Sequence, residues 1–267
     1  NSERTFMITP SASAVDVTAG KDNVFQVCFT DPNQGISSAD YIAENMPDAK
    51  IAVLYRNDDA YSQGIHDTFV KEATEKGMSV VYKGTFTNDT ATDFSVQLTG
   101  AQSAGADLLF LPIYYTPASV ILTQANAMGY APTFFGVDGM DGILTAENFD
   151  ASLAEGVYLL TPFSADSEDE MTQNFVAEYQ DRFGEIPNQF GADAYDAIYT
   201  LYQAIQAAGA TADMSNEEIC DALIEVMPTL AVTGLTSAGS EMTWDENGAV
   251  SKDPTAVIIE NGTYVTP

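Results

Sequence analysis

Apolar segments that alternate with helical segments constrain the fold of this chain more than any other feature. Between residues 62 and 76, apolar side chains recur with helical spacing at Ile65, Phe69 and Ala73. A strand that is apolar throughout is buried on both faces, and strands that alternate with helices form a parallel sheet. The sequence therefore predicts an α/β fold, with parallel sheets flanked by helices. The strand-like segments are residues 50–55, 78–82, 107–111, 133–137 and 156–161.

Turn and capping residues support these boundaries. Gly77, Gly105 and Gly129 each follow a helical segment directly, where a left-handed residue commonly ends a helix. Asn261-Gly262 separates two short strand-like segments and predicts a tight hairpin. After residue 164 the pattern changes to helices in close succession, over 168–183, 190–208 and 215–227.

The composition excludes several classes of function. The chain has 267 residues, enough for two lobes, and carries 39 acidic against 9 basic side chains, a formal net charge of −30. A field of that sign repels phosphate backbones, so we expect no nucleic-acid partner. The acidic residues are scattered, which is typical of a solvated surface.

Motifs for catalysis and for metal binding are absent from the sequence. The single histidine, His66, has no cysteine or second histidine near it, and no nucleophile elbow, Walker loop or dinucleotide motif follows a strand. Cys28 and Cys220 stand alone in apolar surroundings, which favours buried free thiols over a disulfide. We therefore expect no enzyme, no metal and no cofactor.

The predicted carboxyl ends of the strands carry hydroxyl groups, aromatic rings and a carboxylate. Ligands of open α/β sheets bind at these ends. Hydroxyl groups and a carboxylate can hold an ammonium group, while tyrosines supply apolar walls with a polar tip. The pattern predicts a site for a small polar solute. Its candidates from these loops are Ser11, Ser13, Tyr61, Tyr114, Tyr115 and Asp138.

Asp138 and Asp141 also form a carboxylate pair, which leaves a hydrolase as an alternative. The two residues are three positions apart in a glycine-rich loop. That spacing is more simply explained by a turn and a helix N-cap.

Several stretches then carry a family resemblance over the whole chain and in the right order. They resemble the branched-chain amino-acid (Leu/Ile/Val) binding proteins of ABC transporters, which have the type I periplasmic binding protein fold. The stretches are residues 7–13, 24–35, 59–64, 93–96, 112–117, 135–139, 195–199 and 242–248.

The resemblance implies a role for each candidate residue. Ser11, through its backbone carbonyl, and Ser13, through its hydroxyl group, match residues that hold the ligand ammonium, and Asp138 matches the acidic residue that neutralises it. Many members have Glu at that position, so the shorter Asp implies a differently shaped pocket. Aromatic residues that contact the ligand are matched by Tyr61, Tyr115, Tyr114 and Phe190.

The resemblance also implies two lobes, of which the first is incomplete. Lobe 1 is expected in residues 1–31 and 163–238, and lobe 2 in residues 32–162 and 239–267. Family members carry a further N-terminal segment, so we expect an N-terminally truncated chain, produced by shortening or proteolysis. The polar residues 1–4 show no export signal. Exposed edges of lobe 1 would then favour self-association.

The function implied by the resemblance is that of an extracytoplasmic solute-binding protein. It would deliver an amino acid, branched-chain or similar, to the permease of an ABC transporter by hinge closure. Its place would be the periplasm, or the cell surface with a lipid anchor. Amides, aromatic acids or short peptides stay open as ligands, and a ligand-sensing receptor domain of the same fold stays open as an alternative.

Overall fold

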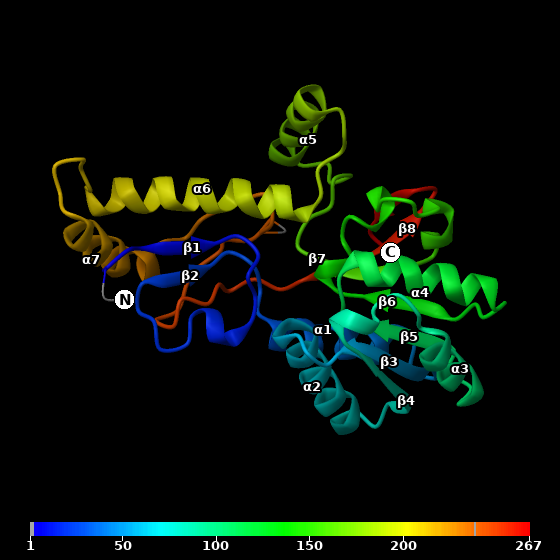
Figure 1. Cartoon of the computed structure of the whole chain (residues 1–267). Helices are drawn as coiled ribbons and strands as arrows, with labels where there is room; N and C mark the ends of the chain where they lie inside the picture. Colours follow the sequence, from blue (N-terminus) through cyan, green and yellow to red (C-terminus); the bar gives the residue numbers. More distant parts are fainter. Residues whose placement is uncertain (1–2, 238) are drawn as a thin grey trace. The chain divides into compact units, whose positions relative to one another are not determined.

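The computed structural model describes residues 3–237 and 239–267. The chain forms two compact units, each made from two separate stretches of sequence (Figure 1). Unit 1 contains the residues up to Thr30 and Ser167–Asp253, and unit 2 contains Asp31–Asp166 and Pro254–Pro267.

Unit 2 is built on one mixed sheet with the strand order β4-β3-β5-β6-β7-β8-β9. The strands from β4 to β7 are parallel, which confirms the predicted parallel sheet, and β8 and β9 are antiparallel to their neighbours. The strands are β3 (Lys50–Arg56), β4 (Ser79–Phe86), β5 (Leu108–Leu111), β6 (Thr133–Gly136), β7 (Tyr158–Thr161), β8 (Thr255–Glu260) and β9 (Thr263–Val265).

Helices cover both faces of this sheet, because alternate residues of each buried strand point to opposite sides. Ile51 and Val53 of β3 pack with α1 and α2, whereas Ala52 and Leu54 pack with α3 and α4. The helices are α1 (Asp31–Asn45), α2 (Ala60–Glu75), α3 (Ser95–Ser103) and α4 (Tyr115–Ala127), with short 3₁₀ turns η2 (Asn88–Thr90), η3 (Asp138–Met140), η4 (Ile143–Thr145) and η5 (Ala151–Ala154).

The predicted turns are present in unit 2. Gly77, Gly105 and Gly129 all have positive φ, between 67° and 75°, directly after α2, α3 and α4. Asn261 and Gly262 also have positive φ and join β8 to β9 in the predicted hairpin. The sequence pattern does not predict α1, because its first residues, Asp-Pro-Asn-Gln-Gly, are those of a turn.

Unit 1 combines a small parallel sheet with long helices. Its apolar core joins Phe25 and Val27 to Ala197, Leu223 and other buried residues. Cys28 and Cys220 are both buried, as predicted. The elements are β1 (Met7–Thr9), β2 (Val24–Gln26), α5 (Glu170–Phe183), α6 (Gln189–Ala208) and α7 (Asn216–Val226), with the 3₁₀ turns η1 (Val15–Val17) and η6 (Met227–Thr229).

The chain passes from one unit to the other at three points, called crossings below. The last crossing lies later in the chain than the lobe boundary expected from the sequence. The expected lobe boundary falls at residue 238, which is outside the described residues, and it assigns residues 239–267 to lobe 2. The structure keeps residues 239–253 in unit 1. The Trp244 indole donates to the carbonyl of Gln26 at 2.7 Å, and Lys252 Nζ lies 3.1 Å from Asp193 Oδ1. These buried polar contacts fix the segment to unit 1.

The other two crossings differ from expectation by one and four residues. They fall between Thr30 and Asp31 and between Asp166 and Ser167.

Within the described ranges, none of the helices is long and apolar enough to span a membrane.

Candidate functional site

Three strands of unit 2 bring predicted site residues to one edge of the sheet. Tyr61 lies in the first turn of α2 after β3, Tyr114 precedes α4 after β5, and Asp138 follows β6. Because β3, β5 and β6 are parallel neighbours, their carboxyl ends meet at the same edge. Three residues that are distant in sequence are thereby brought together.

A hydrogen-bonded pair forms the centre of this cluster. The Tyr61 hydroxyl donates to Asp138 Oδ1 and accepts a bond of 2.9 Å from the backbone N–H of Gly139. The backbone N–H of Asp138 donates to Gln34 Oε1 at 3.2 Å. Tyr61 is 7% exposed and Asp138 is 5% exposed. The carboxylate is therefore buried and hydrogen-bonded to Tyr61, while Gln34 holds the backbone of the same residue.

Gly139 allows the Tyr61 hydroxyl to approach the main chain. A Cβ atom at this position would lie 2.7 Å from Tyr61 Oη and 3.1 Å from the carbonyl oxygen of Ile113. Real Cβ atoms do not approach other atoms as closely as 2.7 Å. A residue with a side chain would push the hydroxyl away from the turn that carries Asp138.

Tyr114 stacks on Tyr61, with ring centroids 4.7 Å apart and an angle of 22° between the planes. Burial and the charge of Asp138 raise the pKa of Tyr61 well above its usual range. Burial, with Asp59 and Asp138, raises the pKa of Tyr114 to about 12. Both phenols therefore keep their protons at neutral pH and act as donors.

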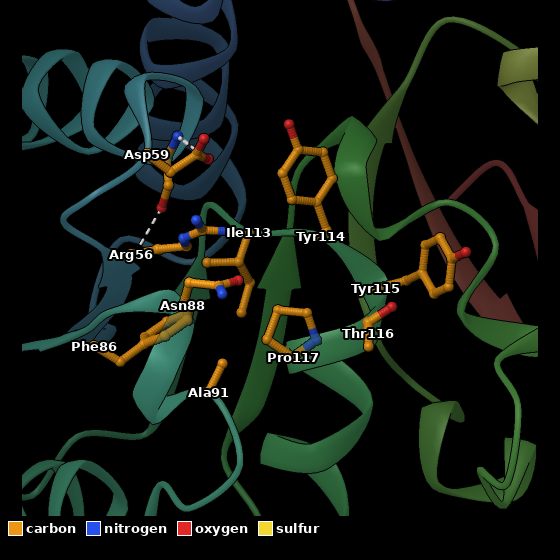
Figure 2. A pocket seen from close by; sticks show the side chains of 11 residues that line it. Arg56, Asp59, Phe86, Asn88, Ala91, Ile113, Tyr114, Tyr115, Thr116 and Pro117 are labelled. Atoms are coloured by element: carbon orange, nitrogen blue, oxygen red, sulfur yellow. Dashed lines mark hydrogen bonds between the residues drawn. The ribbon is translucent and has the colours of Figure 1, made fainter.

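A cavity of about 420 Å³ opens beside Tyr114 in unit 2 (Figure 2). Its volume lies in the range of ~300–1,000 Å³ that is common for small-molecule sites. Arg56 and Asp59 come from the end of β3 and the start of α2, while Tyr114 and Tyr115 come from the start of α4. The Arg56 guanidinium is held by Asp58, whose Oδ1 lies 2.7 Å from Nε. Tyr115 is one of the residues that line the cavity.

Ser11, Ser13 and Phe190 belong to unit 1. Ser13 is buried and Ser11 is exposed, in the loop after β1 that Gln26 holds through a 2.8 Å bond from its Nε2 to the carbonyl of Ala12. Phe190 is half-buried in the first turn of α6. The structure therefore divides the predicted site residues between the two units, with Tyr61, Tyr114, Tyr115 and Asp138 in unit 2.

Asp141 has a different partner from Asp138. The hydroxyl of Tyr264, in the C-terminal hairpin, is hydrogen-bonded to Asp141, and burial together with this carboxylate raises the pKa of Tyr264. Asp138 is the first residue of the turn η3 and Asp141 directly follows that turn, as the turn prediction requires. The prediction that one of the two carboxylates is an N-cap is wrong. The residue directly before η4 is Gly142, whose φ of 102° is left-handed.

Gln34 and Gly139 belong to this cluster, and neither is predicted as a site residue from the sequence. Gln34 lies within the stretch 24–35 that carries the family resemblance, but a motif alone does not show which backbone group its amide contacts. The described ranges contain no group of three or more His, Cys, Asp or Glu residues placed to hold a metal ion.

The fold defines the class to which the protein belongs. Its α/β units have the type I periplasmic binding protein fold, since the chain superposes on a leucine-binding protein (LivK) from Thermotoga maritima with a TM-score of 0.84. The two proteins share 28% identity, over 99% of this chain and 72% of the other. LivJ from Streptococcus pneumoniae, in complex with isoleucine, gives a TM-score of 0.82 at 28% identity, over 99% and 73% of the two chains.

Residues 1–257 match the periplasmic binding protein family, and the chain belongs to this family. The Leu/Ile/Val-binding protein homolog 3 of Brucella melitensis is 27% identical over 247 residues, 92% of this chain and 63% of the relative. A leucine-, isoleucine-, valine-, threonine- and alanine-binding protein of Pseudomonas aeruginosa is 30% identical over 227 residues, 83% and 58% of the two chains. The chain thus spans about three-fifths of the length of these relatives.

Proposed function

We propose that the chain is the ligand-binding part of an extracytoplasmic protein that delivers an amino acid to an ABC transporter. The buried carboxylate of Asp138 carries this proposal. The ammonium group of an amino acid carries the opposite charge and would bind favourably to a carboxylate in buried surroundings. Tyr61 and Tyr114 beside it provide the apolar and hydrogen-bonding surroundings that such a ligand requires.

The ligand we propose is a branched-chain amino acid. Two observations support it: the similarity to proteins named for leucine, isoleucine and valine, and the stacked aromatic rings of Tyr61 and Tyr114 next to Asp138. From unit 1, the carbonyl of Ser11 and the hydroxyl of Ser13 would hold the ammonium, and Phe190 would contact the side chain. Contacts from both units then favour a closed arrangement by their differential affinity, and the permease binds that closed form.

The place of action that follows from the proposal is the periplasm, or the outer face of the membrane with a lipid anchor. Catalysis is not part of the proposal. Asp138 is hydrogen-bonded to Tyr61, whereas Asp141 is hydrogen-bonded to Tyr264. This arrangement does not favour a pair of carboxylates acting on one substrate.

A panel of metabolites tests the proposal on the full-length protein. Leucine, isoleucine and valine should raise the melting temperature in proportion to their affinity, with no turnover of any compound. A melting temperature raised only by compounds without an ammonium group, or turnover of a panel member, would contradict the proposal. Calorimetric titration then gives the stoichiometry.

A further inference from the structure

We propose that Tyr61 is a positioning residue for Asp138 and does not contact the ligand through its hydroxyl group. This inference rests on the proposed function, because it assumes that Asp138 binds the ligand ammonium. It differs from the role implied by the family resemblance, in which the aromatic ring of Tyr61 itself closes over the ligand.

The hydroxyl of Tyr61 is already engaged on both sides. A phenol has one proton to donate, and here that proton goes to Asp138 Oδ1. The oxygen also accepts the N–H of Gly139 at 2.9 Å. To donate a hydrogen bond to a ligand, Tyr61 would have to release the buried carboxylate.

The ring of Tyr61 is also enclosed. It is 7% exposed and belongs to the apolar core between the sheet and helices α1 and α2. Tyr114 covers it by stacking at 4.7 Å and is itself 42% exposed. Of the two stacked tyrosines, Tyr114 is the one with surface available to a ligand.

Three residues together set the direction of the Asp138 carboxylate. Gln34 fixes its backbone N–H, Tyr61 fixes Oδ1, and Gly139 leaves space for the Tyr61 hydroxyl. A charged group held in place before binding loses less conformational entropy when the ligand arrives. The hydroxyl of Tyr61 therefore raises ligand affinity only through Asp138.

A double-mutant cycle in the full-length protein tests this coupling, with leucine as the probe. Tyr61→Phe should weaken leucine binding about tenfold, equal to ~1.4 kcal/mol, when Asp138 is present. In the Asp138→Asn background the same change should have less than about a twofold effect. Tyr114→Phe is the matched control, because it removes a hydroxyl from the stacked neighbour and should have the same effect in both backgrounds.

The outcomes separate this inference from the proposed function. Unchanged affinity in Asp138→Asn would overturn the proposed function itself. Weaker binding in Asp138→Asn, with Tyr61→Phe equally harmful in both backgrounds, would overturn only the positioning role. For variants that bind leucine too weakly for titration, the rise in melting temperature in millimolar leucine measures the affinity.

Gly139→Ala gives a second test that leaves both side chains intact. The added Cβ should displace the Tyr61 hydroxyl and weaken leucine binding as much as Tyr61→Phe does. Because both changes break the same hydrogen bond, the two together should weaken binding no further than either alone. Full additivity of the two effects would contradict the positioning role.

Discussion

The hydroxyl of Tyr61 donates a hydrogen bond to the carboxylate of Asp138, 77 positions further along the chain. This bond joins the first turn of α2 to the turn after β6, across the carboxyl end of β5. Both residues lie within unit 2.

The buried ion pair of Lys252 with Asp193 should be important for the stability of unit 1. Both side chains are 2% exposed, and Lys252 Nζ also donates to Thr236 Oγ1 at 2.6 Å. Lys252→Met would leave a buried carboxylate without its counter-charge and should lower the free energy of unfolding by ~3–5 kcal/mol. Chemical denaturation followed by circular dichroism measures this loss.

The exposed pair of Arg182 with Glu178 is the matched control, since its side chains are 64% and 68% exposed. Arg182→Met should change the free energy of unfolding by no more than ~0.5 kcal/mol. Equal losses in the two variants would show that burial of the pair around Lys252 has no special role.

His66 should make stability depend on pH, and it is the only histidine in the chain. Its ring stacks on Tyr55 at 3.7 Å, and burial lowers its pKa from 6.5, although Asp67 opposes the shift. The unfolded chain therefore binds the proton more readily than the folded one. Stability should be highest above about pH 6.5 and fall as the pH drops through that value towards the lowered pKa.

The variant His66→Gln isolates this effect, because every other titrating group is unchanged. The free energy of unfolding should fall less steeply in the variant than in the wild type between about pH 7.5 and 5.5. Identical slopes in the two proteins would contradict the shift attributed to burial of His66.

Unit 2 should fold without unit 1. Its two stretches end close together, because Thr161 of β7 pairs with Thr255 of β8 in the antiparallel register. Residues 31–166 joined by a short linker to residues 254–267 should give a cooperative thermal transition and an α/β circular dichroism spectrum. The control without residues 254–267 leaves the edge of β7 unpaired and should be much less stable. A linked protein that melts without cooperativity would refute this prediction.

The chain should self-associate through apolar side chains of α5 and α6. Phe183, Ile198 and Tyr202 are 64%, 66% and 58% exposed. Exposed apolar patches favour association once salt screens the net charge of −30. Sedimentation of the 267-residue chain at raised ionic strength should therefore show oligomers, and Ile198→Ser with Tyr202→Ser should reduce them.

The matched control for association is Val96→Ser in unit 2, a side chain that is 76% exposed on α3. This change should leave the distribution of oligomers as it is. A monomeric wild-type chain at all concentrations, or an equal effect of Val96→Ser, would contradict the prediction.

The sequence predicts the strands of unit 2 well, because a strand such as residues 50–55 is apolar throughout and buried on both faces. It does not predict that β5 lies between β3 and β6, since strand order depends on packing between distant segments. The late crossing after Asp253 was missed for a similar reason. The contacts of Trp244 and Lys252 with unit 1 leave no local pattern in the sequence.

Candidate site residues could be proposed from the sequence, but the contacts among them could not. The loops that follow the strands, together with the family resemblance, pointed to Tyr61, Tyr114, Tyr115 and Asp138, and the structure places all four at one edge of one sheet. The hydrogen bond between the Tyr61 hydroxyl and Asp138 is not predictable from the sequence. It depends on the space left by Gly139 and on the position of the turn after β6 in the folded chain.

Calorimetric titration of full-length Asp138→Asn with leucine tests the central claim most directly. Asp150→Asn is the control, because Asp150 likewise lies at the start of a 3₁₀ turn but is exposed. We predict a loss of at least ~2 kcal/mol of binding free energy in Asp138→Asn, since the ligand ammonium would lose a buried partner, and wild-type affinity in Asp150→Asn. Leucine affinity in Asp138→Asn equal to that of the wild type would contradict the account.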